Sequence, residues 1–233
     1  YFRDGKYIYP HHKTNNGKKD FWARGDGWVL AGLAKVLQDM PHTYRHYNFF
    51  VKKYITLANA VAKLQQKEGY WTRSMMDPLQ APGPETSGTA FFTYGMLWGV
   101  NNGILDAAQY RPVINRAWKY LSETALQPDG KIGYVQPIGE KAIPGQVVDK
   151  NSEANFGTGA FLLAASEYVK YIGNGLQRVS FNVHNSLDFQ IQKLAKVSLD
   201  SICKGLGCGN GDDIIVRDAH GNEVEYQKSY DGK

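Results

Sequence analysis

The stretch Phe21-Trp22-Ala23-Arg24-Gly25-Asp26-Gly27-Trp28 decides how this chain is expected to fold. From Trp28 to Leu37, apolar residues recur at spacings of three and four, which predicts a helix over residues 22–39. Pro41 follows that helix, and proline cannot continue one. Arg24 and Trp28 are four residues apart and therefore share one face of the predicted helix.

Four more helices are predicted, and they alternate between two kinds. The helices that begin near Gly25, Gly88 and Gly157 carry almost no charge in their opening turns, whereas those between them are amphipathic. This alternation is typical of helical hairpins with buried inner and half-exposed outer members. We therefore expect an all-α toroid of hairpins, with a ligand site at the glycine-rich ends of the inner helices. The four helices are expected over 44–66, 87–101, 107–124 and 158–171, with a turn and short strand over 129–135.

The C-terminal part of the chain has a different pattern. Apolar and polar residues alternate over Val179-Ser180-Phe181-Asn182-Val183, which is typical of a strand. We expect a helical domain over 1–175 and a small β-rich segment over 176–233, the start of a β-sandwich. Cys203 and Cys208 lie in this segment, and a short-loop disulfide and two free thiols both fit their spacing. The compartment stays open, with a periplasmic or secreted protein slightly favoured over a cytoplasmic one.

Composition limits the classes of partner. The 27 basic and 22 acidic residues give a net charge of +5, which suits an acidic ligand, but the basic residues are scattered, so we expect no nucleic acid. No apolar run approaches the roughly 18 residues of a membrane helix, so no membrane span is expected. His11 and His12 lack a carboxylate at metal-binding spacing, and we expect no metal site. Because no initiator methionine or signal peptide precedes Tyr1, we expect a processed chain or a fragment.

The opening stretch carries the main binding hypothesis. Two indoles beside one guanidinium suit a sugar acid, because indole rings stack on the C–H face of a pyranose and arginine binds a carboxylate through two parallel hydrogen bonds. This assigns substrate binding to Trp22, Arg24 and Trp28. The alternative is a buried aromatic cluster in which Arg24 stabilises the structure.

Other residues are weaker candidates for the same site. Asp26 lies in the first turn of its helix, where the helix dipole favours a carboxylate, and a catalytic role is the alternative. Glu85 and Glu153 precede inner helices and fit either a general acid or base or a helix-start carboxylate. Asp4 is a candidate for substrate binding, and Trp71 for added stacking surface at the rim.

Four segments, in order, resemble glycoside hydrolase family 105, the unsaturated rhamnogalacturonyl hydrolases, and its relative, family 88. The first is Phe21 to Pro41, and the others are Glu85-Thr86-Ser87-Gly88-Thr89-Ala90, residues 133–139, and residues 157–164 with Ser166-Glu167. Together they span residues 1–172. Position 26 usually carries Asn in this family, so Asp26 is a departure. Residues 215–224 and 226–232 resemble a β-rich domain of unknown function found beside pectin-degrading hydrolases.

The resemblance implies an (α/α)6 barrel, of which this chain would hold the C-terminal half. It also implies hydrolysis of 4,5-unsaturated galacturonyl-rhamnose oligosaccharides, which lyases release from pectin. An Asp protonates the double bond, water adds at the neighbouring carbon, and the resulting hemiketal opens and expels the rest of the sugar chain. Neither a metal nor another cofactor is implied. Trp22, Arg24 and Trp28 match the motif that lines the substrate pocket.

The resemblance places the proton-donating Asp upstream of Tyr1, so these 233 residues are expected to bind weakly and turn over poorly. Two alternatives stay open. One is a non-catalytic sugar-binding or structural fragment, and the other is a different α/α-toroid enzyme, such as a polysaccharide lyase or a sugar epimerase. An open half-barrel would also expose the apolar flanks of its end helices, which predicts self-association.

Overall fold

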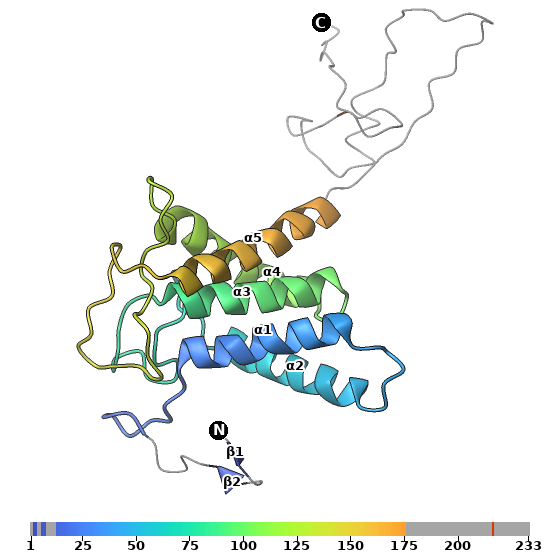
Figure 1. Ribbon diagram of the computed structural model, residues 1–233, viewed down its shortest axis with the longest axis horizontal. Coiled ribbons are helices and arrows are strands. Elements are labelled where there is room, and N and C mark those ends of the chain that lie inside the picture. Colours follow the sequence, from blue (N-terminus) through green and yellow to red (C-terminus); the bar gives the residue numbers. More distant parts are fainter. Residues whose placement is uncertain (1, 4–5, 8–12, 176–215, 217–233) are drawn as a thin grey trace, which may run out of the picture. The chain divides into compact units, whose positions relative to one another are not determined.

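The computed structural model describes residues 2–3, 6–7, 13–175 and 216. Contacts divide the chain into two units, Tyr1–Asn174 and Gly175–Lys233. The predicted strands of the second unit and both of its cysteines lie outside the described residues. The described elements are the antiparallel pair β1 (Phe2–Arg3) and β2 (Lys6–Tyr7), then α1 (Ala23–Asp39), α2 (Tyr47–Ala62), α3 (Thr86–Asn101), α4 (Ala107–Tyr120), the π-helical turn η1 (Leu121–Ala125) and α5 (Asn155–Gly175) (Figure 1).

The helices form two layers. Inner helices α1, α3 and α5 run side by side, and α2 and α4 pack behind them as outer helices (Figure 1). The Trp118 ring of α4 stacks on Tyr168 of α5, with centroids 4.1 Å apart, so aromatic packing joins α4 to α5. The predicted alternation of inner and outer helices is confirmed, and the chain has the all-α toroid fold.

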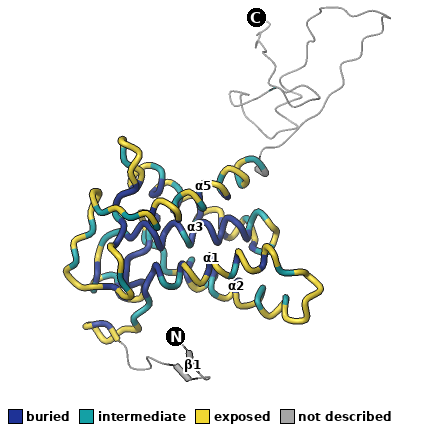
Figure 2. Tube along the Cα trace, viewed as in Figure 1, coloured by how far each residue is buried: buried dark blue, intermediate teal, exposed yellow. Residues whose placement is uncertain are grey.

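The core centres on α3, which lies between α1 and α5 and against both outer helices. Almost all of its residues are buried (Figure 2), including Phe92, Met96 and Leu97. A helix with neighbours on every side needs no polar face, which explains why its sequence lacks the amphipathic pattern of α4. The hydroxyl of Tyr54 on α2 donates to the carbonyl of Gly95, tying the outer layer to α3.

Two glycines of α3 permit close packing against α1. A Cβ placed on Gly88 would lie 2.8 Å from the backbone carbon of Ala23, and one on Gly95 would lie 2.7 Å from Cγ of Leu30. Real Cβ atoms do not approach other heavy atoms so closely, so only glycine fits without a shift. The prediction that glycine at the start of an inner helix allows close backbone approach is confirmed at Gly88.

Several local predictions need correction. The second helix ends at Ala62 rather than at residue 66, because the chain turns and the amide of Gln66 donates to the carbonyl of Tyr70. Over residues 129–135 the predicted turn is present, but the predicted short strand is wrong. Only an isolated bridge joins Leu126 to Ile132, and Tyr134, with a φ of 59°, breaks the extended path.

Gly88→Ala tests the close packing of α1 on α3. The added methyl group meets backbone that cannot move freely, so we expect it to lower the free energy of unfolding by about 1–3 kcal/mol in chemical denaturation. Gly32→Ala is the matched control, because a Cβ there meets nothing within 4 Å. The control should stabilise α1 by roughly 0.5–1 kcal/mol. Equal effects of the two substitutions would contradict this packing.

Candidate functional site

The start of α1 is anchored to a neighbouring loop through its backbone. The amide of Ala23 donates to the carbonyl of Arg73 at 3.0 Å, and the amide of Met75 donates to the carbonyl of Phe21 at 2.9 Å. Trp22 is the N-cap residue, with extended backbone and no side-chain cap. Backbone pairing therefore fixes the direction in which the side chains of Trp22 and Arg24 leave the helix start.

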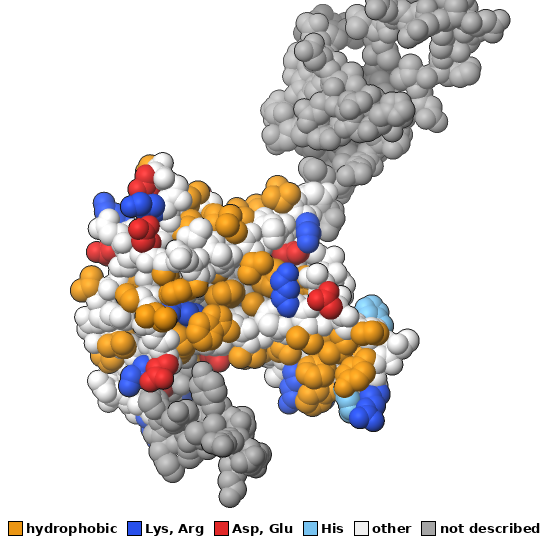
Figure 3. Space-filling view, in the orientation of Figure 1, with side chains coloured by type: hydrophobic (Ala, Val, Ile, Leu, Met, Phe, Trp, Pro, Cys, Tyr) orange, Lys and Arg blue, Asp and Glu red, His pale blue; other side chains and the backbone are white. Residues whose placement is uncertain are grey.

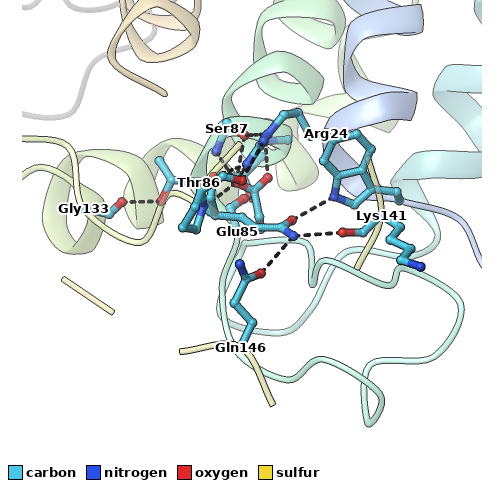
Figure 4. A network of polar contacts seen from close by, with 12 residues as sticks. Arg24, Glu85, Thr86, Ser87, Gly133, Lys141 and Gln146 are labelled. Carbon is cyan, nitrogen blue, oxygen red and sulfur yellow. Dashed lines mark hydrogen bonds and ion pairs between the residues drawn. The ribbon is translucent and has the colours of Figure 1, made fainter. Parts of the chain in front are cut away.

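Arg24 is buried, with 1% of its surface exposed. Its Nε donates to Oγ of Ser87 at 2.8 Å, and its two terminal nitrogens donate to the carbonyls of Pro137 (3.2 Å) and Gln136. Nη2 also lies 3.6 Å from Oε1 of Glu85, which forms an ion pair with it (Figure 4). Burial lowers the pKa of Arg24, and the nearby charge of Glu85 offsets that effect. The guanidinium therefore joins α1, α3 and the segment around residue 136.

Glu85 caps α3 at the centre of this network. Its Oε2 accepts from the amide of Gly88 at 2.7 Å, and its Oε1 accepts from Oγ of Ser87 at 2.7 Å and from the amide of Gln136 at 3.2 Å. The side chain is fully buried. These contacts correspond to the helix-start role rather than the acid–base role, and Glu85 is the N-cap residue of α3.

Gln136 completes the network and is a residue that the sequence pattern does not single out. Its Oε1 accepts from the indole nitrogen of Trp22 at 2.8 Å, and its Nε2 donates to the carbonyl of Lys141 at 2.9 Å and to Oε1 of Gln146 at 3.0 Å (Figure 4). Both ends of its amide are thus used. Its place within residues 133–139, one of the four segments that carry the family resemblance, was an available signal, whereas its burial is visible only in the fold.

Aromatic rings surround the Arg24 guanidinium. Its central carbon lies 5.0 Å from the ring centroid of Trp22 and 4.3 Å from that of Phe156 at the start of α5. Trp22 in turn meets Trp28 edge to face, with centroids 5.4 Å apart. Trp28 keeps 48% of its surface exposed, whereas Trp22 is buried. The structure thus brings Trp22, Arg24 and Trp28 together, and it exposes Trp28.

The other candidates separate from this group. Trp71 is fully buried, donates its indole N–H to the carbonyl of Val61 at 2.9 Å and packs on Phe92. Because it offers no surface to a sugar ring, the prediction that it adds stacking surface at the rim is wrong. Glu153 is exposed and lies 3.9 Å from Lys131. Asp4 lies outside the described residues, as do His11 and His12. Among the residues the structure describes, no cluster of His, Cys, Asp or Glu could hold a metal ion.

Two depressions on the described chain lie away from this site. A depression of about 340 Å³ lies near the C-terminal ends of the inner helices, lined in part by Gln38, Asn101 and Glu167. A second depression, lined in part by Val36 and Tyr44, lies at the end of α1. The aromatic and arginine chemistry is at the opposite ends of these helices, so these depressions do not belong to it.

Known proteins resemble this chain over most of its length. The sequence model of Glycosyl Hydrolase Family 88 matches residues 1–172. An unsaturated 3S-rhamnoglycuronyl hydrolase from Formosa agariphila is 44% identical over 158 residues, which are 68% of this chain and 41% of that protein. One of the same name from an Alteromonas species is 38% identical over 167 residues, 72% of this chain and 39% of that protein. The chain thus spans about 40% of the length of these relatives.

Solved structures agree with the fold. A glycosyl hydrolase family 88 protein from Bacteroides vulgatus is 63% identical with a TM-score of 0.69, covering 73% of this chain and 49% of that one. A structure described as a polysaccharide lyase is 68% identical with a TM-score of 0.69, covering 79% and 50%. A possible family 105 member from Salmonella enterica, at 23% identity and a TM-score of 0.57, covers 65% and 40% and supports the fold alone.

Asp26 provides a pH-dependent test of how the site is packed. Its Oδ2 is buried without a hydrogen-bond partner, and burial raises the pKa of Asp26 from 3.8 to about 6. The pKa of Asp26 is higher in the folded chain than in the unfolded chain, so Asp26 favours folding most when it is protonated. That contribution to stability is full below about pH 4 and is lost as the pH rises through about 6.

Asp26→Asn, which stays neutral, should therefore raise the free energy of unfolding at about pH 7 by about 1–3 kcal/mol. At about pH 4 the gain should nearly vanish, because the native carboxyl is then protonated in the folded chain. Urea denaturation at both pH values measures the two gains. A gain of equal size at both would show that the carboxylate is not the cause.

Proposed function

The chain belongs to glycosyl hydrolase family 88, and we propose that it forms part of a glycoside hydrolase acting on 4,5-unsaturated uronyl-rhamnose oligosaccharides. The names of the two curated relatives support a substrate with an unsaturated uronic acid joined to rhamnose. Galacturonyl-rhamnose fragments of lyase-degraded pectin are the member of this class that the sequence resemblance favours.

One observation carries the proposal: an exposed indole lies near a buried guanidinium at the start of the inner helices. Trp28 offers 48% of its surface, and its ring is held edge-on by Trp22, which Gln136 and Arg24 fix in turn. A flat, exposed and immobilised ring suits the C–H face of a pyranose. Trp28 is therefore assigned as the stacking residue.

We do not assign to Arg24 a direct contact with the substrate carboxylate. Its Nε and both terminal nitrogens already donate to protein oxygens, and it is 1% exposed. We assign to it the positioning of Trp22 and of the backbone at residues 136 and 137. Its charge is balanced by Glu85, so Arg24 acts on the site through the groups that it holds in place.

The proposed reaction is hydration followed by ring opening. A carboxylic acid transfers a proton to one carbon of the double bond, and water adds its hydroxyl to the neighbouring carbon and returns a proton to the carboxylate. The hemiketal so formed opens to a ketone and releases the attached sugar as an alcohol. We propose that the general acid is a residue other than Glu85, because Glu85 is enclosed in the cap of α3.

A polysaccharide lyase is the second candidate, favoured by the 68% identical structure that is described as one. The two reactions act on the same bond in opposite directions. A lyase removes the proton beside the uronate carboxyl and breaks the glycosidic bond at the next carbon, which releases the attached sugar and forms the double bond, whereas the hydrolase consumes that double bond by adding water. The lyase therefore raises the ultraviolet absorbance of the conjugated enol-carboxylate, whereas the hydrolase lowers it.

Association with a second copy is proposed as well. The end helices carry apolar side chains on open faces, Val29 and Val36 on α1 and Leu162 and Val169 on α5. Figure 3 shows hydrophobic side chains gathered on the face formed by the inner helices.

Within the part of the chain that the structure describes, no helix is long and apolar enough to cross a membrane.

The ultraviolet absorbance of the enol-carboxylate decides between the two reactions. With lyase-generated uronyl-rhamnose oligosaccharides and the longest protein that contains these residues, we expect the absorbance to fall, because hydration removes the conjugation. A rise on intact polysaccharide instead would establish the lyase. No change on either substrate would contradict both and leave a binding role.

A further inference from the structure

Phe156 is a part of this site that the opening motif does not contain. It lies in the first turn of α5, 132 residues after Arg24 in the chain, and its ring centroid is 4.3 Å from the guanidinium carbon. The start of α5 is held close to the segment before Gln136, since a Cβ on Gly157 would come 2.4 Å from Cγ2 of Val135. The ring is thus placed by a close helix contact rather than by a loop.

The ring contacts form one connected series from α5 to α1. Phe156 contacts Arg24, Arg24 contacts Trp22, and Trp22 contacts Trp28. The two inner members are buried, whereas Phe156 is half-buried and Trp28 exposed. The series therefore ends in an open aromatic surface on each of two different inner helices, with a buried positive charge between them.

Two open rings on either side of a charge suit one ligand chemistry. A sugar ring presents C–H bonds that are polarised positive, and these favour the electron-rich face of an aromatic ring. An oligosaccharide can place successive pyranose rings against two separate aromatic surfaces, which the buried Arg24 holds in place. A purely structural phenyl ring would gain more from full burial, as Trp71 does.

We propose that Phe156 is a second stacking residue of the site, which binds a pyranose ring of the oligosaccharide from the α5 side while Trp28 binds from the α1 side. This inference rests on the proposed function, whose site it extends to a second inner helix. Phe156 also covers the Arg24 guanidinium, so the ligand contacts the ring and not the charge. Recognition is therefore by stacking across α1 and α5, and Arg24 acts by holding the rings in position.

Phe156→Leu removes the aromatic face and retains an apolar side chain. With the oligosaccharides and the protein used above, we expect KM to rise roughly fivefold to tenfold and kcat to stay within about twofold, because stacking contributes to binding. Phe156→Tyr should restore the native KM. Phe161→Leu is the matched control on the same helix, since Phe161 stacks on Trp118 at 5.9 Å and away from Arg24, and it should leave KM unchanged.

A KM for Phe156→Leu equal to that of the control would overturn the inference while leaving the hydrolase intact. A lower KM would also overturn it, because the ring would then be a cover that hides Arg24 from the substrate. Quenching of tryptophan fluorescence by the same oligosaccharides gives the affinity without turnover. If the native protein binds them through Phe156 but does not consume them, the proposed function fails and the stacking assignment stands. If it does not bind them at all, both fail.

Discussion

A guanidinium that leaves water must find hydrogen-bond acceptors and negative charge in the protein, and this requirement at Arg24 organises the start of the inner helices. The cost of burying an unpaired charge is several kcal/mol. Ser87, the carbonyls of residues 136 and 137, and the carboxylate of Glu85 together meet it. These partners come from two separate parts of the chain, both distant from Arg24 in the sequence. Satisfying one side chain therefore brings together α1, α3 and the segment before α5.

The same interactions link the fold to the site. Glu85 satisfies the free amides at the start of α3 and also balances the charge of Arg24, so one carboxylate serves both the helix and the network. Gly88 permits the backbone approach that makes those contacts short enough. Trp22 is then held from two sides, by Gln136 and by the guanidinium, and it supports the exposed Trp28. The proposed binding surface therefore rests on residues that are buried and paired.

The sequence predicted the helices and their two classes well, because hydrophobic spacing and glycine positions are local signals. It could not show that Arg24 is buried, since its partners Ser87 and Pro137 are 63 and 113 residues away in the chain. Trp71 was misjudged for the same reason: a loop tryptophan looks exposed until α2 and α3 are seen to enclose it. The spacing of α5 gave no indication that Phe156 would meet α1. Asp4, the tail and its cysteines lie outside the described residues, so those predictions stand as predictions.

The central claim is that the Arg24–Glu85 pair joins α1 to α3, and a double-mutant cycle tests it most directly. Arg24→Met and Glu85→Gln are made singly and together, and the free energy of unfolding of each variant is measured by chemical denaturation. Because each side chain loses its charged partner in the other's variant, we predict a coupling energy of roughly 1–3 kcal/mol. Effects that add to within about 0.5 kcal/mol would mean that the two residues act independently, and would contradict the account.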